Sequence, residues 1–170
     1  MSTRIAAKPE ASRDATTRLL PRILREGYGP GAWHGADMKA ALSDVAPELA
    51  FWRSQPERHN IAEIALHHTY YSRTVRARLL GTTPERFPID GEDWFPADSS
   101  AAMPWDRILA LAQTEQERLA HAVDDVAAGR ESSPLAEDER LDLVLGITCH
   151  AAYHAGQVQL IKRLRENGGS

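Results

Sequence analysis

The sequence predicts an all-α protein, a bundle of four long helices with one extra short helix. Two observations predict this fold: four segments repeat apolar residues at the helical period, and no segment shows the period-two alternation of an exposed strand. A chain of 170 residues fits one domain with a substantial core. We expect residues 1–10 to be a disordered N-terminal end and residues 11–167 to be this single domain.

The N-terminal part predicts one long and one short helix. Leu20 and Leu24 belong to an apolar stripe that predicts a helix over residues 11–26, which the glycines of residues 27–31 end. The short helix is expected to open at Trp33 and to continue through Val45.

The second long helix has the clearest start signal in the chain. Asn60 with Glu63 three positions later forms a capping box, and Gly81 ends the helix after Leu80. The proline-containing segment 82–103 then predicts a long surface connection, in which Trp94 and Phe95 could cover a site.

Two further long helices complete the bundle. Pro104 suits the first position of a helix that we expect to reach residue 127. The last helix is expected over residues 137–165, because it begins with acidic residues and ends with basic ones, as the helix dipole favours.

Composition excludes several classes of function. The net charge of −4 gives no basic field for nucleic acid. The N-terminus is too polar for a signal peptide and no apolar run reaches the length of a membrane span, so we expect a cytoplasmic protein without a membrane partner. A single cysteine, Cys149, excludes an internal disulfide and any CxxC zinc site. We interpret Cys149 as a small buried residue and not as a nucleophile.

The last helix carries the chemical signal of the chain. His150 and His154 lie four residues apart, on one helix face, at positions where core leucines are expected. One such histidine would be explained as a hydrogen-bonded core residue. Two buried imidazoles each need a partner, and one shared metal ion satisfies both. The HExxH protease pattern is absent, because Ala151 replaces its glutamate.

A two-histidine site needs a third ligand. Candidates are His34, His67 and His68, whereas His59 and His121 are expected on solvated faces. Adjacent helix residues point about 100° apart, so only one of His67 and His68 faces the core squarely. Periodicity alone leaves that choice open.

Three stretches together resemble the DinB-like (DinB/YfiT) superfamily. They are residues 59–81, residues 150–157 and the entry motif of residues 33–35, and the resemblance spans about residues 33–164. It implies a four-helix bundle, often a homodimer, with a three-histidine metal site. Carried over residue by residue, the ligands are His67, His150 and His154. At His68 relatives tend to carry an aliphatic residue, so here it is a packing residue or a second polar group.

The resemblance also implies a function. Three protein nitrogens leave an open position on the ion, which activates a bound water or thiol. Similar proteins include thiol-dependent S-transferases and a thiol-dependent isomerase. We therefore expect a metal-dependent enzyme that transfers a low-molecular-weight thiol to an electrophilic small molecule, with zinc or nickel as the ion. The alternatives are a metal-dependent hydrolase of a small molecule and a non-enzymatic, stress-related metal-binding protein.

Other polar and aromatic residues are candidates for the surroundings of the ligands or for a substrate pocket. They are Trp33, His34, Glu63, His68, Tyr71 and Gln157. For Glu63 the capping box is the preferred interpretation over a carboxylate that orients a ligand ring. No residue besides the ligands is identifiable as catalytic.

Overall fold

The computed structural model describes residues 10–101 and 103–167, with the side chains of residues 10–17 left out. The helices are α1 (Glu10–Tyr28), α2 (Met38–Leu42), α3 (Pro47–Ala50), α4 (Ile61–Leu80), α5 (Trp105–Ala127) and α6 (Glu137–Asn167). The described residues contain no strand, so the prediction of an all-α bundle is confirmed. The expected disordered end, residues 1–10, lies outside the described residues except for Glu10, which begins α1.

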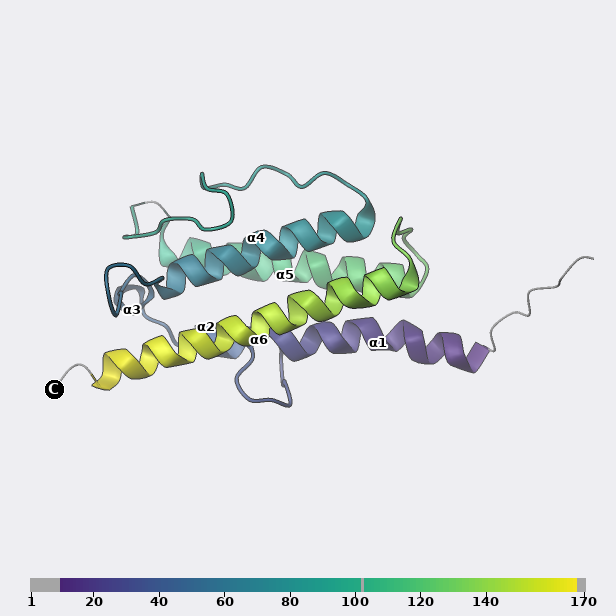
Figure 1. The fold of residues 1–170 in the computed structure, drawn as a ribbon, viewed down its shortest axis with the longest axis horizontal. Coiled ribbons are helices and arrows are strands. Elements are labelled where there is room, and N and C mark those ends of the chain that lie inside the picture. The colour runs from purple at the N-terminus through teal and green to yellow at the C-terminus, as the bar shows by residue number, and fades with distance from the viewer. Residues whose placement is uncertain (1–9, 102, 168–170) are drawn as a thin grey trace, which may run out of the picture.

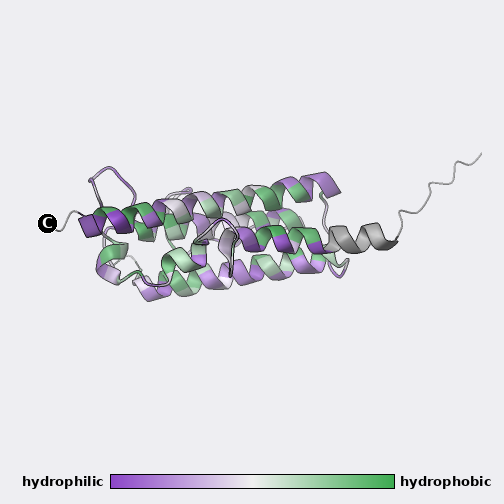
Figure 2. Cartoon of the chain, turned by 90° about the horizontal axis from the view of Figure 1, so that it is seen from below, coloured by the Kyte–Doolittle hydropathy of each residue, from purple (hydrophilic) through white to green (hydrophobic). Residues whose placement is uncertain are grey.

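The four long helices pack in a ring. α4 contacts α5 and α6, and α1 contacts the same two helices from the other side. Figure 1 shows α6 running antiparallel to α4, so that the start of α4 lies near the C-terminal half of α6. Hydrophobic and hydrophilic residues share each long helix (Figure 2), as expected of helices with one buried face.

Asn60 fixes both the start of α4 and the long connection after it. Its Oδ1 accepts the backbone N–H of Glu63 at 2.9 Å, and its Nδ2 donates to the carbonyl oxygen of Ala97 at 2.7 Å. The predicted N-cap is therefore present. The other half of the capping box was wrong, because the Glu63 carboxylate turns instead to Arg53, His59 and the backbone N–H of Ala97.

A polar layer separates two apolar clusters inside the bundle. One cluster gathers the first turns of α4 with the later part of α6, from Ile61 to Leu66 and from Ala151 to Ile161. The other includes Val75, Leu79 and Val144. Between them lie buried polar side chains, namely those of His67, His68, Ser72, Arg73, Glu115 and Gln116. The middle of the bundle is thus built from groups that need partners.

Three details of the structure differ from the sequence prediction. The short helix begins at Met38 and not at Trp33, because Oδ1 of Asp37 accepts the N–H of Ala40 at 2.9 Å and caps it there. A second short helix, α3, follows with Pro47 at its start. Cys149 is exposed, contrary to the expectation of a buried residue. None of the described helices combines the length and apolar character needed to cross a membrane.

Candidate metal centre

Three histidines from two antiparallel helices meet in the polar layer. Nε2 of His150 lies 3.1 Å from Nε2 of His67 and 3.1 Å from Nε2 of His154. Taking one nitrogen from each of the three rings, all three nitrogens lie within 4.8 Å of one another. The i, i+4 spacing on α6 aligns His150 with His154, and α4 supplies His67 across the helix interface.

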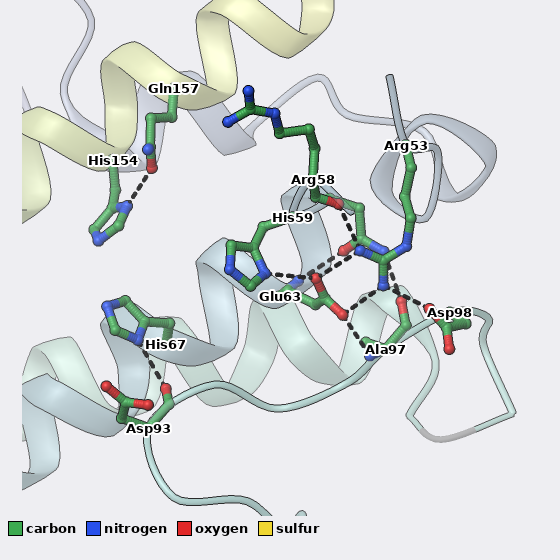
Figure 3. A network of polar contacts seen from close by, with 11 residues as sticks. Arg53, Arg58, His59, Glu63, His67, Asp93, Ala97, Asp98, His154 and Gln157 are labelled. Carbon is green, nitrogen blue, oxygen red and sulfur yellow. Dashed lines mark hydrogen bonds and ion pairs between the residues drawn. The ribbon is translucent and has the colours of Figure 1, made fainter. Parts of the chain in front are cut away.

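The outer nitrogens of two of these rings are fixed by oxygen acceptors. Nδ1 of His67 donates to the carbonyl oxygen of Asp93 at 2.7 Å, and Nδ1 of His154 donates to Oε1 of Gln157 at 2.6 Å (Figure 3). The side-chain Nε2 of Gln157 in turn donates to the Tyr153 hydroxyl at 3.1 Å. Because the Nδ1 atoms carry the protons, Nε2 of His67 and of His154 each present a bare lone pair.

The third ring is oriented by a fourth histidine. Nδ1 of His150 lies 3.2 Å from Nδ1 of the fully buried His68. A proton on Nδ1 of His150 makes this a hydrogen bond to His68 and leaves Nε2 of His150 bare as well. The structure therefore places His67 in the cluster and His68 behind it, as a partner of His150.

The three nitrogens fit a metal ion. Even if Nε2 of His150 carried a proton, that proton could satisfy only one of the two lone pairs that face it. A cation satisfies all three nitrogens at once. Tetrahedral zinc with bonds of about 2.0–2.1 Å to nitrogen needs ligand atoms roughly 3.3 Å apart. The two distances from Nε2 of His150, both 3.1 Å, are close to this value, and the third pair lies within 4.8 Å. Histidines whose other ring nitrogen donates to an oxygen are typical of protein metal sites.

Burial keeps these imidazoles neutral. It lowers the pKa of His150 to about 4, with help from the nearby His154 and His67. Burial also lowers the pKa of His154 to about 4, against the opposing effect of the Gln157 hydrogen bond. For His68 burial lowers the pKa to about 3, and for His67 it lowers the pKa despite the Asp93 carbonyl. Neutral imidazole is the form that binds metal.

Aromatic rings enclose one side of the cluster. The indole of Trp94 stacks on His67 with centroids 3.9 Å apart, and on His59 with centroids 3.6 Å apart. Tyr71 contacts both His67 and His150, at centroid distances of 4.9 and 5.0 Å. The connection between α4 and α5 thus covers the site through Trp94, whereas Phe95 is buried in the core.

Two cavities lie along the interface of α4 and α6, one on each side of the cluster. The first, of about 480 Å³, is lined by His150 and Tyr71 and extends towards the start of α6. The second, of about 570 Å³, is lined by His59 and Gln157 and extends towards the end of α6. Either is large enough for a small molecule.

Two residues proposed from the sequence are not brought to this cluster. Trp33 is 92% exposed, and its backbone N–H donates to Glu26. Nε2 of His34 bonds the carbonyl oxygen of Glu26 at 2.7 Å, so His34 serves the loop after α1.

Sequence reasoning missed two contributors to the site. One is the backbone carbonyl of Asp93, which no side-chain pattern reveals. The other is His59, which is exposed, as expected, and yet lines the second cavity; its i, i+4 spacing to Glu63 was the signal that could have found it.

The lowered histidine pKa values predict how the stability of the metal-free protein depends on pH. Unfolded histidines titrate near 6.5, whereas His150 and His154 titrate near 4 in the folded protein. Between these values the unfolded chain binds more protons, so the free energy of unfolding falls as the pH falls from 7 to 5. Urea unfolding at several pH values measures this. The variant His121→Gln, at an exposed position, should give the same curve. A free energy of unfolding that stayed constant or rose towards pH 5 would contradict the prediction.

The amino-acid sequence matches one known protein family. No curated protein and no solved structure matches the chain. The family model of the DinB superfamily matches residues 32–158, which include α4, the covering connection and both histidines of α6. This match covers most of the chain and agrees with the helical bundle and the three-histidine cluster. The chain therefore belongs to the DinB superfamily.

Proposed function

We propose that this protein is a metal-dependent enzyme that transfers a small thiol to an electrophilic small molecule, with His67, His150 and His154 as the metal ligands. The observation that carries the proposal is the convergence of one nitrogen from each of three histidines, two of them buried and one half-buried. A bound divalent ion, zinc or nickel, would keep positions for exogenous ligands and would deprotonate a thiol or water that occupied one.

The residues around the cluster have separate tasks in this proposal. The Asp93 carbonyl, Gln157 and His68 hold the three rings so that their lone pairs face one point. The rings of Trp94 and Tyr71 exclude water from one side of that point. The two flanking cavities offer separate places for a thiol and for its acceptor.

Thiol transfer is preferred on family analogy, and two alternatives remain to be tested against it. With water in place of the thiol, the same site would support hydrolysis of a small molecule. With no exchangeable ligand it would be a non-enzymatic, stress-related metal-binding protein. A cytoplasmic location and a homodimer are further proposals that rest on the family resemblance.

Replacing His67 and His68 one at a time tests which of these neighbouring residues is a metal ligand. His67→Leu removes a lone pair and should abolish stoichiometric zinc binding. His68→Leu removes only the partner of His150 and should keep one zinc per chain with roughly 10- to 100-fold lower affinity, as for other losses of a ligand's hydrogen-bond partner. Competition titration with a chromophoric chelator measures both. A larger loss at His68, or full affinity in His150→Leu, would contradict the assignment.

Activity should require both the ion and a thiol. Zinc-loaded protein mixed with 2-mercaptoethanol and 1-chloro-2,4-dinitrobenzene should form the thioether faster than the uncatalysed control, and a chelator should abolish the acceleration. Helix content by circular dichroism should survive chelation, because two apolar clusters hold the bundle.

The parallel control is a panel of esters and amides without thiol. Turnover of that panel, with no dependence on thiol, would support hydrolysis instead. Tight zinc binding without turnover in either assay would support the binding-protein alternative.

A further inference from the structure

His59 lies immediately before α4 and is held by a buried carboxylate. Its Nδ1 is 3.0 Å from Oε2 of Glu63, a residue that is only 4% exposed. Figure 3 shows the same carboxylate receiving hydrogen bonds from Arg53 and from the backbone of Ala97. Burial raises the pKa of Glu63, but these hydrogen bonds outweigh it and hold the pKa below its usual value. Glu63 is therefore an anion that fixes the His59 ring through Nδ1.

The ring of His59 is also fixed relative to the metal centre. It stacks on Trp94 with a tilt of 5°, and His67 stacks on the same indole with a tilt of 6°. Two rings cannot share one face of an indole at these distances, so His59 and His67 lie on opposite faces. Figure 3 shows the His59 ring on the side of the site on which His67 and His154 lie, and the indole of Trp94 stands between His59 and His67.

Nε2 of His59 makes no hydrogen bond to the described residues; the side chain is 47% exposed, and its ring lines the cavity of about 570 Å³. Gln157, the hydrogen-bond partner of His154, lines the same cavity, which therefore borders a residue that orients one of the ligand rings. Leu160, Ile161 and Leu164 form an apolar wall. A small electrophile with an apolar body fits this wall.

We propose that His59, oriented by Glu63, is the base that takes the thiol proton beside the three-histidine centre. The inference rests on the proposed function and adds a residue to it. A fixed carboxylate on Nδ1 and a free Nε2 form the arrangement by which enzymes use histidine for proton transfer, directly or through one water.

The S–H bond breaks and its proton passes to Nε2 of His59, while the sulfur electron pair forms the new S–C bond. The bond between that carbon and the leaving group breaks, and the electron pair goes to the leaving group. The proton then passes from His59 to the leaving group, or to solvent when that group is a stable anion such as chloride.

Proton counting tests the first half of this step without turnover. Zinc-loaded wild-type protein and the His59→Gln and His121→Gln variants are titrated with 2-mercaptoethanol by calorimetry at pH 7 in buffers of different ionisation enthalpy. His121 is exposed on α5 and serves as the matched control. Wild type and His121→Gln should release fewer protons to the buffer than His59→Gln, by up to one per thiol bound. Equal release by all three would overturn the inference.

Turnover tests the second half. His59→Gln should keep the zinc affinity and thermal midpoint of His121→Gln while transferring the thiol roughly 10²- to 10⁴-fold more slowly. Added imidazole should accelerate His59→Gly and leave His121→Gly unchanged. If His59→Gln transferred the thiol at the wild-type rate, or if loss of zinc explained its slow rate, the role of His59 would be overturned. The proposed function would not be affected. A wild-type protein that neither binds nor transfers the thiol would overturn the proposed function, and this inference with it.

Discussion

Three imidazole nitrogens that face one another, with at most one proton among them, are the constraint around which the middle of this bundle is arranged. Each ring is held by its opposite nitrogen: His67 by a carbonyl, His154 by Gln157 and His150 by His68. Such an arrangement is unfavourable in a low dielectric unless a cation occupies it. The apolar clusters on either side supply the stability that the polar layer lacks.

The connection between α4 and α5 belongs to the site as much as the helices do. Asn60 and Glu63 bind the carbonyl and the N–H of Ala97, respectively, and thereby fasten the connection to the first turn of α4. Asp93 and Trp94 then meet His67, about one turn after Glu63 along the helix. A single anchored segment thus sets the orientation of a ligand, covers it and forms a wall next to His59.

The sequence predicted most of the fold because periodicity and caps are local signals. The bounds of the long helices came within a few residues, and the paired histidines of α6 were visible from their spacing. The sequence could not show which of His67 and His68 is the ligand, because both are buried. Only their contacts with α6 distinguish the two. Glu63 shows the same limit: its spacing from Asn60 is that of a capping box, but Arg53, ten residues away, draws its carboxylate elsewhere.

X-ray absorption at the zinc edge tests the central claim, a three-histidine centre open to a thiol, most directly. For the zinc-loaded protein it should show three imidazole nitrogens at about 2.0–2.1 Å with one further light ligand, and 2-mercaptoethanol should replace that ligand with a sulfur at about 2.3 Å. The His154→Leu variant should lose one imidazole or fail to bind zinc. Four imidazoles that persist when the thiol is added, or a spectrum unchanged in His154→Leu, would contradict the account.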